Sequence, residues 1–307
     1  MILSIILLII GFFLLAKGAD LLVDGACAVA RKLNIPEIVI GLTIVACGTS
    51  APEAAVSISS VLQGAAGVGV GNILGSNVAN ILLILGVSAL ITNLYVKKNT
   101  VFCEIPFVVF ISVLLMFIGW QYGAVYCGSA SILFGLFLLF LMYLFVVAKK
   151  QQDENKEIKN LSSIKMILFV FFGVAALVLG AKLTVDSAVN IAHALNISER
   201  VIGLTIIAFG TSLPELVTCV VAAVKKHSDI VVGNIIGSNI FNILFVLGVA
   251  GLISPIPFEH AFLIDAAWGI IAAVLLWVFF INDRKLTRGE GLFLLVLYSV
   301  YIVSLIK

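Results

Sequence analysis

Two long segments of this chain occur twice, and the duplication constrains the fold more than any other feature. Residues 41–56 read GLTIVACGTSAPEAAV and residues 203–218 read GLTIIAFGTSLPELVT, with ten of sixteen positions identical. Residues 71–86 and 233–248 read GNILGSNVANILLILG and GNIIGSNIFNILFVLG, with eleven of sixteen identical. Both pairs are separated by 162 positions, so we predict two structurally equivalent halves.

The composition predicts that these halves lie in a membrane. Of the 307 residues, 62% are hydrophobic and 11% are charged, whereas a soluble domain is usually about 45–50% apolar and about 25% charged. Several apolar runs exceed the ~20 residues that a helix needs to cross a bilayer. No basic stripe typical of nucleic-acid binding lies outside the short loops. We therefore expect an all-α polytopic membrane protein that binds no nucleic acid.

The apolar runs predict ten transmembrane helices, five in each half. The only strongly polar stretch, KKQQDENKEIKNLSSIK at 149–165, is the expected linker between a first repeat at 1–148 and a second at 166–307. Because five is odd, the second half enters the membrane from the opposite side, which predicts two inverted five-helix repeats. The ten spans are expected at residues 2–24, 36–62, 67–92, 102–119, 126–148, 164–187, 198–223, 229–253, 261–281 and 289–306.

The positive residues predict the orientation of these spans. With the N-terminus outside, fourteen of the eighteen Lys and Arg residues fall in inner loops, and only Arg200 and Lys307 fall in outer segments. Cytoplasmic loops carry such an excess of Lys and Arg. We therefore expect both termini on the extracytoplasmic side and the linker in the cytoplasm.

Each copy places one carboxylate directly after a break in a transmembrane helix. Pro52 and Pro214 lack the N–H of a helical hydrogen bond and clash with the preceding turn, so the helices should kink or break there. Broken backbone at membrane depth is tolerated only where it is buried in protein or lines a polar cavity. Glu53 and Glu215 follow the prolines, and ionisable groups at this depth indicate a functional site. We predict that the two carboxylates meet at one buried point.

Neutral oxygens accompany both carboxylates. Ser76 and Asn80 are four residues apart and share a helix face, as do Ser238 and Asn242. Carboxylate, hydroxyl and amide oxygens without His or clustered Cys favour a hard cation such as Ca²⁺ over a transition metal. The candidate metal-ligating residues are Glu53, Glu215, Thr49, Thr211, Ser50, Ser212, Ser76, Ser238, Asn80 and Asn242.

The charge of the two carboxylates predicts exchange. Together they neutralise one Ca²⁺, and without it they repel each other and require Na⁺ or H⁺ in its place. We therefore expect Ca²⁺ and Na⁺ as transported ions, with H⁺ as a further candidate, and no resident cofactor.

The paired GTS-x-PE and GN-x-x-GSN segments resemble the alpha repeats of the calcium/cation antiporter superfamily, particularly prokaryotic sodium/calcium exchangers, over nearly the whole chain. The resemblance implies Glu53 and Glu215 as shared Ca²⁺ and Na⁺ ligands at the centre of two inverted halves. It also implies that the first and sixth spans slide across the remaining core to alternate access, in a cell (inner) membrane.

The same resemblance assigns the remaining polar groups. It implies ligand carbonyls at Thr49 and Thr211, a central polar position at Asn80, and flanking Na⁺ sites at Ser50, Ser76, Ser212 and Ser238. Asn242 departs from the pattern, because well-studied exchangers that resemble this chain carry an acidic residue there. One negative charge is therefore missing, which leaves open the number of Na⁺ ions per Ca²⁺ and whether H⁺ is the coupling ion.

Two other classes of function remain as alternatives. Channel pores are usually lined by rings of equivalent groups from several subunits, whereas this chain completes a two-fold site alone and is expected to function as a monomer in the lipid bilayer. An intramembrane hydrolase would need a base near Ser50 or Ser212. No His lies in any span near these serines and Gly-x-Ser-x-Gly is absent, so we expect no enzyme.

The other chemically active side chains are predicted to be structural. The five cysteines lack metal-ligand spacing and are expected to pack as small apolar residues. Asp24 is expected to cap an adjoining segment. Glu37 falls in the first turn of a broken helix, where an acidic residue stabilises the helix N-terminus by about 0.3–1 kcal/mol.

Overall fold

The computed structural model describes residues 2–150, 163–195 and 208–306, and the chain is almost entirely helical within them. The first half, in which η marks a π-helical turn, contains α1 (Ile2–Leu33), α2 (Glu37–Ile40), η1 (Gly41–Val45), α3 (Ala46–Thr49), α4 (Ala51–Leu62), α5 (Ala66–Ala79), η2 (Asn80–Leu85), α6 (Gly86–Ile91), η3 (Thr100–Glu104), α7 (Ile105–Tyr122) and α8 (Cys127–Lys150). The second half contains α9 (Ser163–Ala194), α11 (Ala208–Gly210), α12 (Leu213–Val224), α13 (Ser228–Ile240), η5 (Phe241–Val246), α14 (Leu247–Ile253), α15 (His260–Asp283) and α16 (Arg288–Ile306).

Eight of the described helices are long and apolar enough to cross a membrane, and a bent pair of helices forms a ninth candidate span. The chain is therefore a multi-pass membrane protein, as its composition predicts. The predicted seventh span, 198–223, begins outside the described residues, and its described part holds α11 and α12. The predicted linker lies mostly outside them as well.

Two helices extend well beyond their predicted ends. α1 and α9 each contain 32 residues, which corresponds to about 48 Å at 1.5 Å per residue. The hydrocarbon core of a bilayer is only about 30 Å thick. Their more polar ends continue the helix past the apolar run on which the predictions 2–24 and 164–187 were based.

The predicted break before Glu53 is confirmed. The helix that ends at Thr49 and the helix that begins at Ala51 are bent by 51°. Ser50 lies at the bend with φ −82° and ψ 7°, and Ser212 has nearly the same conformation, with φ −87° and ψ 5°. The proline lies in the first turn of α4 and of α12, where its missing N–H is tolerated.

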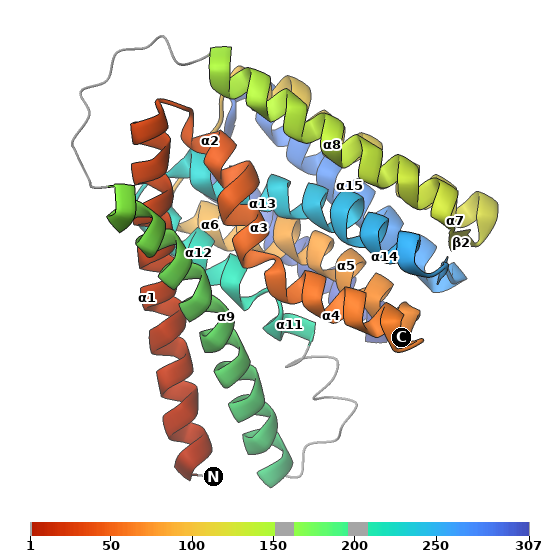
Figure 1. Cartoon of the computed structure of the whole chain (residues 1–307), viewed down its shortest axis with the longest axis horizontal. Helices are drawn as coiled ribbons and strands as arrows, with labels where there is room; N and C mark the ends of the chain where they lie inside the picture. Colours follow the sequence, from red (N-terminus) through yellow and green to blue (C-terminus); the bar gives the residue numbers. More distant parts are fainter. Residues whose placement is uncertain (1, 151–162, 196–207, 307) are drawn as a thin grey trace.

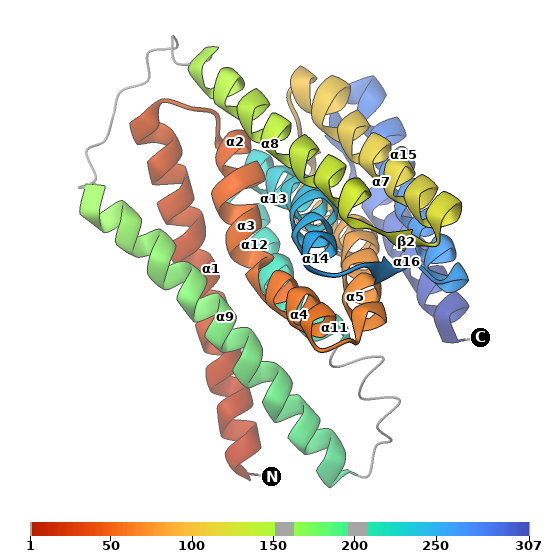
Figure 2. The same cartoon turned by 45° about the vertical axis from the view of Figure 1, so that its right-hand side comes forward.

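α1 and α9 lie side by side, away from α7, α8 and α15, in both Figure 1 and Figure 2. Glycines permit the backbones of this pair to approach closely. A Cβ added at Gly18 would lie 2.8 Å from the carbonyl oxygen of Gly173, and one added at Gly173 would lie 2.7 Å from the amide nitrogen of Leu22. Gly11 and Gly180 have equally close contacts. Small residues of this kind are typical of tightly packed transmembrane helices.

The centre of the molecule is formed by the equivalent segments α5–η2–α6 and α13–η5–α14. In their most apolar windows, 78% and 94% of the residues are buried, compared with 22% in α1. Gly237 on α13 packs on the backbone of η1, where an added Cβ would lie 2.7 Å from the carbonyl oxygen of Leu42. The duplicated motifs therefore lie inside the bundle.

Four short strands are a feature that the all-α prediction lacked. They are β1 (Leu94–Tyr95), β2 (Ala124–Val125), β3 (Ile256–Pro257) and β4 (Lys285–Leu286). β1 pairs with β4 and β2 with β3, both antiparallel, so every pair joins one half of the chain to the other. These pairs give loop N–H and C=O groups a hydrogen-bond partner, and their length leaves the fold class all-helical.

Candidate ion-binding site

The two predicted carboxylates are buried and are each bound by the opposite half of the chain. Glu53 and Glu215 are both 1% exposed and lie in the first turns of α4 and α12. Ser50 Oγ donates to Glu215 Oε1 at 2.8 Å, and Ser212 Oγ donates to Glu53 Oε1 at 3.3 Å. These reciprocal hydrogen bonds bring the two broken helices together at their breaks.

A second reciprocal pair of hydrogen bonds surrounds the carboxylates. Thr49 Oγ1 donates to Asn234 Oδ1 at 3.1 Å, and Thr211 Oγ1 donates to Asn72 Oδ1 at 3.2 Å. The amide group of Asn72 donates in turn to Ser57 Oγ at 3.1 Å. Each threonine side chain therefore joins the helix break of its own half to the opposite half, Thr49 to α13 and Thr211 to α5.

Four asparagines form a third layer where the π-helical turns begin. Asn80 Nδ2 donates to Asn239 Oδ1 at 3.0 Å, and Asn242 Nδ2 donates to Asn77 Oδ1 at 3.1 Å. All four are buried. π-helical turns occur frequently at functional sites, and here η2 and η5 place the equivalent Asn80 and Asn242 in equivalent surroundings.

Several oxygens in these layers lack a hydrogen-bond partner within the described part of the chain. They are Glu53 Oε2, Glu215 Oε2, Asn80 Oδ1, Asn242 Oδ1 and Ser238 Oγ. A buried polar group without a partner costs about 1–3 kcal/mol, and more if it is charged. All five atoms are acceptors of the kind that Ca²⁺ prefers, so a cation would remove this cost.

The ten predicted residues all lie around the two breaks and the two π-helical turns. Nine are buried and Thr211 is half-buried. Ser212 Oγ also lies 3.3 Å from Ser76 Oγ, from which it can accept a hydrogen bond while it donates to Glu53. Sequence reasoning missed Asn77 and Asn239 as polar members of this centre. The signal was present, because both belong to the repeated GN-x-x-GSN motif.

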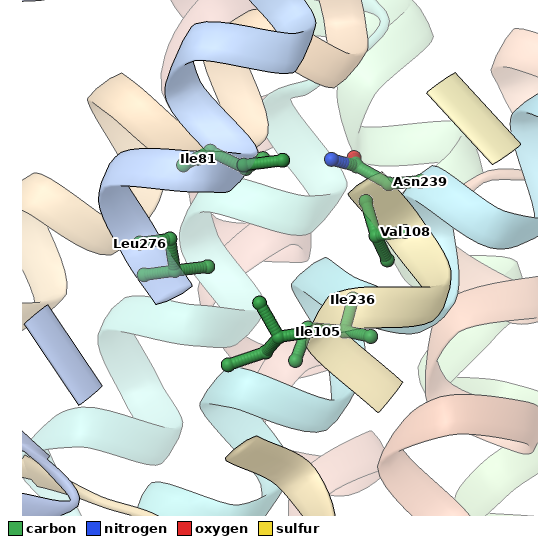
Figure 3. Close-up of a pocket in the computed structure, with 7 residues that line it drawn as sticks. Ile81, Ile105, Val108, Ile236, Asn239 and Leu276 are labelled. Atoms are coloured by element: carbon green, nitrogen blue, oxygen red, sulfur yellow. The ribbon is translucent and has the colours of Figure 1, made fainter. Parts of the chain in front are cut away.

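Small cavities lie beside the asparagine layer. One of about 10 Å³ is shown in Figure 3, where Asn239 is the only polar side chain among the labelled residues. Its lining consists of Ile81, Ile105, Val108, Ile236, Asn239, Ala273 and Leu276. This volume corresponds to about one water molecule, and an apolar lining of this kind does not coordinate a cation.

Comparison with known proteins gives a family match over nearly the whole chain. The family described as sodium/calcium exchanger protein matches residues 3–148 and 165–307. The two matched ranges contain both copies of the duplicated motifs.

Three curated relatives match over nearly their full lengths. The putative antiporter CaxA of Alkalimonas amylolytica is 36% identical over 98% of this chain and 98% of its own. The sodium/calcium exchanger MaX1 of Methanosarcina acetivorans is also 36% identical, again over 98% of both chains. The inner membrane protein YrbG of Escherichia coli is 36% identical over 99% of this chain and 97% of its own.

Solved structures resemble the described fold. A structure of the sodium-calcium exchanger NCX_Mj, soaked with Na⁺ and Sr²⁺, superposes with a TM-score of 0.87 at 36% sequence identity, covering 99% of both chains. The same exchanger soaked with Na⁺ and no Ca²⁺ gives a TM-score of 0.88.

Proposed function

Because the chain belongs to the sodium/calcium exchanger family, we propose that it exchanges Ca²⁺ for Na⁺ across a membrane, with Glu53 and Glu215 as the shared cation ligands. The family membership confirms the resemblance to the calcium/cation antiporter superfamily, and it makes the chain an ion-transporting antiporter and not an enzyme.

The observation that carries this proposal is the pair of buried, reciprocally held carboxylates. Each has one oxygen fixed by a serine of the other half and one oxygen without a partner among the described residues. Two carboxylates balance the charge of one Ca²⁺ or of two Na⁺. Neither the empty pair nor a bare cation is stable in a low-dielectric interior, so loss of one ion favours binding of the other.

We propose the remaining eight predicted residues as neutral ligands, with the centre close to the bilayer midplane. Asn80 Oδ1, Asn242 Oδ1 and Ser238 Oγ support this, because they are buried without a partner in the described ranges. The single chain supplies both carboxylates, which supports function as a monomer.

Exchanged contacts between the halves support the inverted-repeat architecture. Residues 162 positions apart make equivalent bonds to the opposite half, as with Ser50 and Ser212. β1 corresponds to β3 at the same offset and β2 to β4 within one residue of it, and each strand pairs across the halves. We propose ten spans in two inverted five-helix repeats, residues 1–148 and 166–307, joined by a cytoplasmic linker at 149–165.

The basic loops support the proposed orientation. Lys225 pairs with Asp20 and Asp24 near the end of α1 that carries Arg31, and β1 and β4 join two further loops that contain basic residues. We propose that this end faces the cytoplasm of a cell (inner) membrane, and that both termini face outward. We further propose that α1 and α9, joined through their glycines, move together across the core to alternate access.

The test is transport of radioactive Ca²⁺ into proteoliposomes, driven by a Na⁺ gradient. Wild type should accumulate Ca²⁺, and Glu53→Gln and Glu215→Gln should each abolish accumulation while remaining folded. Glu104→Gln is the matched control, because Glu104 is also buried, at 3% exposure, but hydrogen-bonds to Tyr143 away from the site. Undiminished flux in either central variant would refute the site.

Coupling to H⁺ is the second candidate, and a single residue favours it. Asn242 gives the second repeat a neutral amide, so the described residues of the centre supply two carboxylates and no third. The same vesicles with a pH gradient and no Na⁺ separate the candidates: accumulation under these conditions would assign H⁺ as the coupling ion.

A further inference from the structure

A cysteine, a glutamate and a histidine meet at the end of α1, away from the central carboxylates. Cys27 belongs to α1, Glu37 begins α2, and His227 lies in the turn between α12 and α13. Their ligand atoms all lie within 4.8 Å of one another. Cys27 is only 3% exposed, whereas the side chains of Glu37 and His227 are half-buried. Residues distant in sequence thus present sulfur, nitrogen and oxygen ligands at one point.

The cluster borders a cavity. Its volume is about 210 Å³, and Cys27 and His227 both contribute to its lining. This is enough space for a metal-bound water beside the three protein ligands. Asp24 adds a negative charge to the lining, and Arg31 and Lys165 add two positive ones. These three charges sum to +1, while a Cys27 thiolate and the Glu37 carboxylate supply two negative charges to a bound cation.

The ligand set differs in chemistry from the central site. Ca²⁺ takes oxygen ligands, whereas thiolate, imidazole and carboxylate together are typical of Zn²⁺, with bonds of about 2.0–2.3 Å. In a tetrahedron with such bonds the ligand atoms lie about 3.3–3.8 Å apart. His227 Nδ1 and Glu37 Oε2 are 3.0 Å apart, and no two of the three ligand atoms are more than 4.8 Å apart. Side-chain movement of about 1 Å therefore brings all three atoms to the tetrahedral spacing.

We propose that Cys27, Glu37 and His227 bind Zn²⁺ or a similar divalent transition metal, with water as the fourth ligand, and that this metal fastens α1 to the core. The three ligands come from three elements, of which only one is α1. Lys225 already pairs with Asp20 at 2.5 Å and with Asp24 at 2.7 Å at the same end of α1. A metal bond would add a stronger connection at this point.

The connection has a consequence for transport, which rests on the proposed function. If α1 moves with α9 across the core, a metal that joins α1 to α2 and to the α12–α13 turn holds α1 in one position relative to the core. Zn²⁺ should therefore inhibit exchange without occupying the central carboxylates.

Metal binding is measured on the full-length purified protein, with Ca²⁺ present to occupy the centre. Zn²⁺ is titrated against a chromophoric chelator, and Co²⁺ is used as a spectroscopic probe because a thiolate ligand gives a charge-transfer absorption. We expect one Zn²⁺ per chain and a thiolate–Co²⁺ band. Even loss of an outer-shell partner weakens metal binding about 10–100-fold, so Cys27→Ser and His227→Gln should each weaken it at least tenfold and Cys27→Ser should remove the band.

Matched controls are Cys103→Ser and His260→Gln, which change exposed residues outside the cluster. Both should keep the wild-type affinity. Equal affinity in the controls and in Cys27→Ser, or absence of the Co²⁺ band from wild type, would reduce the cluster to a hydrogen-bonded contact between Glu37 and His227 and overturn the proposal.

Flux measurements separate this inference from the proposed function. Zn²⁺ should inhibit wild-type exchange but not exchange by Cys27→Ser. Exchange that is insensitive to bound Zn²⁺ would overturn the inhibitory role. Normal Zn²⁺ binding in a protein that shows no Ca²⁺ flux would leave the metal site supported and refute the proposed function instead.

Discussion

Replacement of Asn242 by aspartate tests the charge count of the central site. Asn242 is fully buried, its Oδ1 has no partner among the described residues, and its Nδ2 donates to Asn77 Oδ1 at 3.1 Å. A carboxylate cannot donate, but Asn77 can turn its amide so that its NH₂ group donates instead. We expect Asn242→Asp to fold, with a third negative charge in the centre.

The third charge should change the electrical behaviour of transport. Two carboxylates balance two Na⁺ or one Ca²⁺, so we expect electroneutral exchange in wild type. Three carboxylates should bind one more Na⁺ and move one net charge per cycle. One charge across about 100 mV corresponds to about 2.3 kcal/mol, and each 1.4 kcal/mol is a factor of ten. The steady-state Ca²⁺ ratio of the variant should therefore shift about 50-fold under such a potential.

The assay imposes a K⁺ diffusion potential on proteoliposomes and measures accumulated Ca²⁺ in wild type, in Asn242→Asp and in the mirror variant Asn80→Asp. Asn99→Asp changes an exposed asparagine outside the centre and serves as the control. A wild-type ratio that already shifts about 50-fold, or active central variants that do not shift at all, would refute the charge count.

Three further outcomes follow from the packing and the hydrogen bonds. Ser50→Ala removes a hydrogen bond to a buried carboxylate, and should lower the stability of the ion-free protein by about 1.5–3 kcal/mol in thermal unfolding. Gly18→Ala places a Cβ 2.8 Å from the Gly173 carbonyl; it should cost about 1–3 kcal/mol and slow Ca²⁺ exchange, whereas Gly128→Ala, with open space around it, should change neither. Ca²⁺ at about 100 times its Kd should stabilise wild type by about 2.7 kcal/mol in the same unfolding assay, and Glu53→Gln should abolish this gain.

The sequence predicted the helix break before Glu53, because strong local rules act there. Pro52 has no N–H to bond to the preceding turn and clashes with it, which favours a kink or break there, and a carboxylate at membrane depth is costly unless it has a role. The duplication then placed the equivalent residues of the second half without further assumptions. The helical class and the bend before Glu53 were confirmed for these reasons.

Features that depend on contacts between distant residues were beyond such rules. Helical spacing placed Ser76 and Asn80 on one face, but the π-helical turn that begins at Asn80 directs its amide to Asn239. Asp24 was expected to cap an adjoining segment, but the spacing of the sequence did not identify its partner, Lys225, 201 positions away. The strand pairs and the cluster around Cys27 likewise join segments whose proximity exists only in the folded bundle.

The crossed serine–carboxylate bonds make the two halves interdependent. Ser50 holds the acid of the second half, and Ser212 holds the acid of the first. A substitution at either serine therefore acts on the charged group that the other half supplies. Chain fragments cut at the linker would each carry an acid without its donor and a donor without its acid. Restoring exchange would require the two fragments to reassemble in the same bilayer, and neither fragment alone should take up Ca²⁺.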